Sequence, residues 1–180
     1  MEYQTIYPFF MKFISSAKIR RLRGGSLGRG AFGEVVKAAL KKDDTNDALS
    51  NNEAIDFNEN ETYAVKIVKD PTIRFILREG CLLNFVNHPF IMNLIACFFY
   101  TELNDFKVSF VIPFAGKKSL EKLISSQKAK FSPIQKNKII YGICRGLLFL
   151  HHQKIYHRDM KSENILMMDD NLPKISDLGT

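Results

Sequence analysis

The sequence has no tryptophan, only three cysteines and no long uninterrupted hydrophobic run. Cys81, Cys97 and Cys144 lie in apolar stretches without CxxC spacing, which argues against a disulfide or zinc framework and predicts reduced thiols in the core. The N-terminal stretch MEYQTIYPFFMKFI is apolar but lacks a basic start, so neither a secretory signal nor a membrane-spanning helix is predicted. We therefore expect a cytoplasmic or nuclear protein without a membrane partner.

Apolar residues make up 46% of the 180 residues, which is enough for the core of one moderate domain or two small lobes. The formal net charge is +7, although the stretch 41–61 is acidic and leaves the rest more basic. Lysines gather between positions 117 and 138, and a solvated face is the simplest account of them. No aromatic residues alternate with these lysines, so no nucleic-acid partner is expected.

The residue pattern predicts a strand-rich first half and a more helical second half. Residues 26–40 have the pattern of two strands around a glycine-rich turn, and 62–68 that of a third strand. Between them, the polar and aperiodic stretch 41–61 predicts a flexible insertion. The other predicted elements are strands at 91–100 and 107–115 with a turn at 101–105, and helices at 72–87, 119–127 and 133–152.

Gly28, Gly30 and Gly33 match the spacing GxGxxG, which alone is a weak sign of phosphate binding. In a dinucleotide-binding domain the third glycine would open a helix, and an acid such as Glu53 would hold the ribose. Here the residues after Gly33 are β-branched, as in a strand, and Glu53 lies in an aperiodic stretch. The alternative is a glycine-rich flap whose backbone N–H groups approach the phosphates of a nucleoside triphosphate.

Such a flap needs a cation near the phosphates, and Lys66 on the predicted strand 62–68 can supply it. A lysine in a half-buried site needs an anionic partner to stay charged, and Glu79 on the next predicted helix can provide one. We expect the Lys66 ammonium to stay exposed in the absence of nucleotide. Substituting Lys66→Met should then weaken phosphate binding more than folding.

The stretch HRDMKSEN, residues 157–164, offers the groups that phosphoryl transfer needs. Asp159 can accept a hydrogen bond from a substrate hydroxyl, and Lys161 can neutralise charge on the transferred group. Asn164 can offer a carbonyl oxygen to Mg²⁺, with the Asp177 carboxylate as a second ligand. Each of these motifs is weak alone, but their occurrence in this order along one chain is a strong signal.

Together these motifs resemble the eukaryotic protein kinase catalytic domain. GRGAFGEV resembles its glycine-rich loop, YAVK its third-strand motif, HRDMKSEN its catalytic loop and DLG its metal-binding triplet. The resemblance implies an α+β, protein-kinase-like two-lobe fold, with a small antiparallel β lobe carrying one main helix and the first helical part of an incomplete large lobe. The implied domains are an N-terminal extension at 1–21, a small lobe at 22–115 with the insertion 41–61, and the start of the large lobe at 116–180.

The resemblance, with Lys161 similar to the serine/threonine class, implies phosphoryl transfer from Mg-ATP to a protein serine or threonine, with ATP and Mg²⁺ as cofactors and an unidentified protein substrate. The implied catalytic residues are Asp159, Lys161, Lys66 and Glu79, and the implied metal ligands are Asn164 and Asp177. The implied nucleotide-binding residues are Leu27, Gly28, Gly30, Gly33, Val35, Ala64, Lys66, Ile112, Pro113, Ala115 and Leu166. The resemblance also implies an apolar spine of Leu83, Leu94, His157 and Leu178.

Three features depart from the family pattern. The insertion 41–61 makes the gap from Gly33 to Lys66 unusually long, although the strands can still pair because loop entropy grows slowly with length. Leu178 replaces the usual phenylalanine of the triplet, which keeps an apolar side chain there. The sequence ends at Thr180, just after DLG, so we expect a fragment with negligible phosphotransfer of its own. We also expect the apolar stripe Ile139, Ile143, Leu147 and Leu150 to be exposed, which would make the large-lobe half prone to association or partly disordered. The alternative function is a non-catalytic ATP-binding or interaction module.

Overall fold

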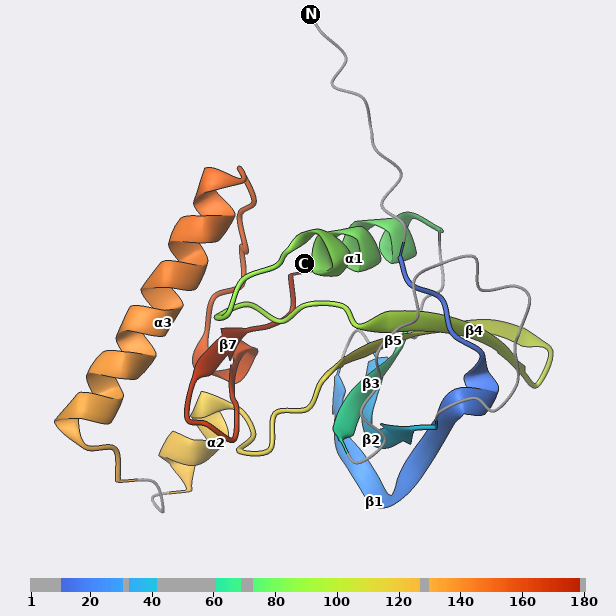
Figure 1. Ribbon diagram of the computed structural model, residues 1–180, viewed down its shortest axis with the longest axis horizontal. Helices are drawn as coiled ribbons and strands as arrows, with labels where there is room; N and C mark the ends of the chain where they lie inside the picture. The colour runs from blue at the N-terminus through green and yellow to red at the C-terminus, as the bar shows by residue number, and fades with distance from the viewer. Residues whose placement is uncertain (1–10, 31–32, 42–60, 69–72, 127–129, 179–180) are drawn as a thin grey trace, which may run out of the picture.

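The computed structural model describes residues 11–30, 33–41, 61–68, 73–126 and 130–178, with backbone alone at 29–30 and 73–77. Five antiparallel strands form one sheet in the order β1-β2-β3-β5-β4, with helix α1 along its upper side in Figure 1. The bounds are β1 Ile19–Gly30, β2 Gly33–Leu40, β3 Thr62–Val68, α1 Ile73–Phe85, β4 Ala96–Glu102 and β5 Asp105–Pro113. This part has the expected architecture of the small lobe.

The second part of the chain is helical and lies to the left in Figure 1. Its elements are α2 Leu120–Ser125, α3 Pro133–His152, and a short hairpin of β6 Ile165–Met167 and β7 Pro173–Ile175. Two short 3-10 turns, η1 Ser16–Lys18 and η2 Ser162–Asn164, complete the described elements. None of the helices in the described ranges is long and apolar enough to cross a membrane.

The predicted strand 91–100 begins too early, because the observed strand β4 starts at Ala96. Residues before it bond elsewhere: Met92 N–H donates to the Ile175 carbonyl at 2.8 Å, and Leu94 N–H to the Leu83 carbonyl at 2.8 Å. The apolar run therefore begins before the strand, and its first residues link the sheet with α1 and β7. At the other end, a two-residue turn with positive φ at Leu103 and Asn104 joins β4 to β5, as in a type I′ hairpin.

The helices occur where the periodicity predicts them, although α1 and α2 are shorter than expected. Helix α3 has the predicted bounds and starts at a capping box: Ser132 Oγ accepts from Gln135 N–H, and Gln135 Oε1 accepts from Ser132 N–H. The expectation that its apolar stripe is exposed is wrong. Ile139 and Leu150 are buried, because this face packs on the large-lobe core and on the residues around β7.

Several expectations need correction or lie outside the described residues. The thiols are free, but only Cys97 is buried, whereas Cys81 is half-buried and Cys144 is exposed. Burial raises the pKa of the Cys97 thiol to about 12.

The insertion, apart from its ends, and Gly179 of the DLG triplet lie outside the described part of the chain. The sequence pattern also gave no sign of the β6–β7 hairpin, whose strands have only three residues each.

Candidate active site

Three elements meet at Lys66, the centre of the candidate site. Lys66 lies on β3 and is only 9% exposed, and its Nζ donates to Glu79 Oε1 from α1. It also donates to Asp177 Oδ1, which follows β7, at 2.9 Å. The expected partner Glu79 is thus in place. The expectation of an exposed ammonium is wrong, because Asp177 comes from the other end of the chain and covers it.

The charges of this cluster depend on one another. Burial by itself lowers the pKa of Lys66, but the charges and hydrogen bonds of Glu79 and Asp177 outweigh burial and raise that pKa above its usual value. Burial raises the pKa of Glu79, and the Lys66 charge offsets part of this rise. Glu79 Oε2 is buried without a hydrogen-bond partner among the described residues. Lys66 is therefore held as a cation, and Glu79 pairs with it through Oε1 while its Oε2 stays without a partner among the described residues.

A second polar group forms around Asp159 in the loop that follows α3. Asp159 Oδ2 accepts from Lys161 Nζ at 2.7 Å and from Asn164 Nδ2 at 3.1 Å. The hydrogen bond from Lys161 is the main reason why the pKa of Asp159 lies below its usual value. Asn164 Nδ2 also donates to the Asp159 carbonyl at 2.8 Å, which fixes the orientation of this amide. Asp159 is consequently ionised, and its Oδ1 accepts no hydrogen bond from the described residues.

A short network links this loop to Asp177. The Asn164 carbonyl accepts from both N–H and Oγ of Ser176, at 2.9 and 3.0 Å, and His157 Nε2 donates to the Ser176 carbonyl at 2.7 Å. Asp177 itself has a φ of 67°, a left-handed conformation that an aspartate adopts only when its surroundings fix it. The network therefore sets the position of Asp177, and with it the second anion beside Lys66.

An apolar cluster lies between the two parts of the chain, and it contains four of the predicted nucleotide-binding residues. Ala64, Ile112 and Met92 are buried in it, with Val35, Phe114 and Leu166 packed against them. Pro113, the last residue of β5, and Ala115 after it are half-buried, whereas Leu27 is 38% exposed. Sequence reasoning missed Met92, which lies within the misplaced strand 91–100. The implied spine is also assembled, since Leu83, Leu94 and Leu178 share one core cluster and His157 is buried.

The glycine-rich stretch spans the ends of β1 and β2, with Gly30 paired to Gly33. A Cβ at Gly33 would lie 2.0 Å from the Ile67 carbonyl oxygen, so close strand pairing alone requires glycine there. A Cβ at Gly28 would meet nothing within 4 Å, so this strand end borders open space. Residues 31–32 of the stretch lie outside the described residues.

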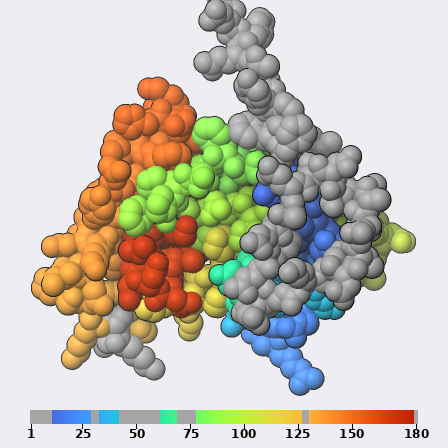
Figure 2. Space-filling model, in the orientation of Figure 1, coloured from blue at the N-terminus to red at the C-terminus, as the bar shows by residue number. Residues whose placement is uncertain are grey.

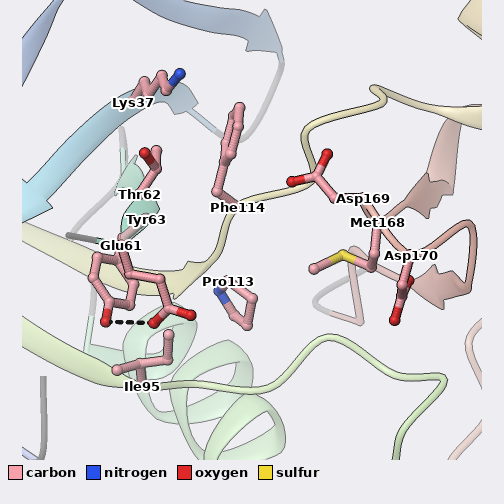
Figure 3. A pocket seen from close by; sticks show the side chains of 10 residues that line it. All are labelled: Lys37, Glu61, Thr62, Tyr63, Ile95, Pro113, Phe114, Met168, Asp169 and Asp170. Carbon is pink, nitrogen blue, oxygen red and sulfur yellow. Dashed lines mark hydrogen bonds between the residues drawn. The ribbon is translucent and has the colours of Figure 1, made fainter. Parts of the chain in front are cut away.

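Figure 3 shows an open cavity that is not the candidate site. Its walls include Tyr63 and Ile95, from the sheet face opposite Ala64, together with Phe114 and Asp169. Consecutive strand residues such as Tyr63 and Ala64 point to opposite faces of the sheet. The cavity, lined by Tyr63, therefore lies on the face of the sheet opposite the apolar cluster that contains Ala64. Pro113 is the only predicted nucleotide-binding residue in its lining.

Residues 22–180 match the family described as the protein kinase domain. The chain belongs to the protein kinase family. Cyclin-dependent kinase 9 of Danio rerio is 29% identical over 178 residues, which cover 96% of this chain and 43% of the relative. The probable serine/threonine-protein kinase PBL20 of Arabidopsis thaliana is 29% identical over 180 residues, 98% of this chain and 43% of the relative.

Sporulation-specific protein 1 of Saccharomyces cerevisiae is 30% identical over 158 residues, 85% of this chain and 28% of the relative. The chain thus spans less than half the length of these relatives. Members of the kinase family generally use ATP and a divalent metal ion. The five-stranded sheet with α1, followed by α2 and α3, is the small lobe and the first part of the large lobe of a kinase.

Proposed function

We propose that the chain is the ATP-binding part of a protein serine/threonine kinase, with a small lobe at 22–115 and the start of the large lobe at 116–180. The ion pairs of Lys66 with Glu79 and Asp177 are the observation that carries this proposal. They bring together the strand lysine, the helix glutamate and the carboxylate after β7 beside an apolar cluster. Such a buried cation next to an apolar slot suits a ligand with a flat ring and phosphates.

In this proposal the adenine ring lies against Ala64, Ile112 and Leu166, and the Pro113 carbonyl and Ala115 N–H bind its edge. Lys66 binds the phosphates, and Gly28 and Gly30 let the backbone approach them. Asp159 orients the hydroxyl of the protein substrate through Oδ1. Because its pKa is lowered, Asp159 is a weak base, so orientation is its main contribution. Lys161 neutralises charge on the transferred phosphoryl group.

The residues present fit a magnesium ion. Both Nδ2 hydrogens of the Asn164 side chain are directed at Asp159, so the side-chain oxygen Oδ1 of Asn164 remains for a ligand. Asp177 Oδ2 makes no hydrogen bond with the described residues. Amide and carboxylate oxygens are the donors that Mg²⁺ prefers. Asn164 and Asp177 would hold the ion, which would supply positive charge to the phosphates.

The proposal is tested by calorimetric titration of the chain with ATP, with and without Mg²⁺. We expect binding that strengthens with Mg²⁺, and we expect Asn164→Ala to abolish that gain while leaving adenosine binding unchanged. A folded chain that binds no nucleotide at millimolar ATP would refute the proposal.

Phosphate transfer is assayed on generic serine and threonine substrates with Asp159→Asn as the control. Nucleotide binding without any phosphate transfer would favour the non-catalytic alternative.

A further inference from the structure

Residues 11–14 precede the part of the chain that matches the kinase family, yet they are built into the small lobe. Phe13 forms a parallel bridge with Cys97 on β4. Cys97 N–H donates to the Lys12 carbonyl at 2.8 Å, and Ile14 N–H donates to the Cys97 carbonyl at 3.0 Å. In Figure 1 this segment begins beside α1 and descends across β4. It is therefore joined to β4, the edge strand of the sheet, by one isolated bridge.

Met11 anchors this segment in the core. It is 8% exposed and belongs to the same buried cluster as Leu83, Phe110 and Leu178. A Cβ on Gly80 of α1 would lie 2.8 Å from Met11 Sδ and 3.1 Å from Phe110 Cε1. The absence of a side chain at Gly80 is thus what lets Met11 pack directly against the helix.

Gly80 follows Glu79, the carboxylate that pairs with Lys66. A shift of α1 at Gly80 moves Glu79 with it, because a helix turn moves as a unit. We propose that Met11 is a positioning residue, which holds α1 where Glu79 can direct Lys66 toward the phosphates. This inference rests on the proposed function and assigns a role to residues outside the kinase match.

The test compares Met11→Ala with the wild type in its affinity for two ligands, ATP and adenosine. If α1 adopts the productive position only one tenth of the time in the variant, ATP affinity falls about tenfold. Adenosine has no phosphates, so its affinity should change little, whereas general destabilisation of the fold would weaken both ligands alike. Met11→Leu should restore ATP affinity because it keeps the volume. The matched control is Phe13→Ala, which removes a half-exposed ring stacked on Phe99 and should alter neither affinity.

Hydrogen exchange of the nucleotide-free chain provides the second arm. Met11→Ala should speed exchange of the α1 amides 79–85, while amides 139–147 of α3 stay protected. Gly80→Ala perturbs the same contact from the helix side. If Met11→Ala does not fold, the experiments are made with Gly80→Ala instead. Equal losses for both ligands, or unchanged α1 exchange, would overturn the inference. A wild type that binds neither ligand would refute the proposed function, and the exchange of α1 would then decide this inference alone.

Discussion

At the scale of single residues, the ion pairs of Lys66 combine an energetic cost with a functional gain. Removing both Lys66 and Glu79 from water costs several kcal/mol per ion, which their attraction offsets only with good geometry. The unpaired Glu79 Oε2 indicates that the compensation is incomplete. A cation held in place by two anions is nevertheless ready to bind phosphate without reorganisation.

We predict that Lys66→Met destabilises the nucleotide-free chain by about 3 kcal/mol near pH 8, since it leaves the Glu79 carboxylate buried without a partner. Unfolding in urea measures this loss. The double variant Lys66→Met/Glu79→Gln should regain most of the stability, because a neutral amide is easier to bury. A loss below about 0.5 kcal/mol, typical of surface substitutions, would contradict the prediction.

The penalty in Lys66→Met should depend on pH through Glu79. Its pKa in the folded chain already lies above the usual 4.5, and loss of the Lys66 charge raises that pKa further. A carboxyl group whose pKa is raised in the folded state stabilises that state at a pH below its unfolded-state pKa. This stabilisation is lost as the pH rises through the folded-state pKa. The difference from wild type should therefore be small near pH 5 and grow toward pH 8, with no such trend in the Glu79→Gln background.

The sequence carries the partners of Lys66 but not their arrangement. Motif spacing and helix periodicity are local properties, and they suffice to pair Lys66 with Glu79. Asp177 lies 111 residues from Lys66, and its contact depends on how the loop after β7 folds against β3. The burial of Lys66 and the packing of Met11 on Gly80 likewise depend on tertiary contacts, which no local pattern encodes.

At the scale of elements, helix ends were predictable where a capping motif marks them. Ser132-Pro133 and Gln135 specify the start of α3 locally, and the observed bound agrees with the prediction. The start of β4 has no such mark, because residues 91–95 are apolar for contacts with α1 and β7 rather than for strand pairing. Periodicity alone cannot separate these two uses of an apolar run.

We predict that Ser132→Ala lowers the free energy of unfolding by about 1 kcal/mol, because the N–H of Gln135 loses its side-chain acceptor at the start of α3. Ser132→Asp should keep the stability, since a carboxylate caps equally well and is favourable at a helix N-terminus. Urea unfolding of the three proteins measures the difference. Equal losses in both variants would show that the cap contributes nothing.

At the scale of the whole molecule, α3 has two apolar faces with different surroundings. The inner face packs on the β6–β7 hairpin and on Phe90, where Gly142 and Gly146 allow close approach. The outer face carries Ile134, Tyr141 and Leu148, which recur every seven residues and are 69%, 60% and 48% exposed. Figure 2 shows α3 along the outer edge of the molecule. A row of exposed apolar side chains of this kind favours association.

We predict that the 180-residue chain, purified on its own, self-associates through this outer face of α3. Sedimentation velocity at increasing protein concentration should show a rising average mass. The double variant Ile134→Glu/Leu148→Glu should remain monomeric over the same range, because two carboxylates on the face oppose its burial. Leu103→Glu is the matched control, since it removes a 96% exposed leucine from the distant β4–β5 turn and should leave association intact. A wild-type chain that stays monomeric at every concentration, or a control that is as monomeric as the double variant, would show that α3 does not drive assembly.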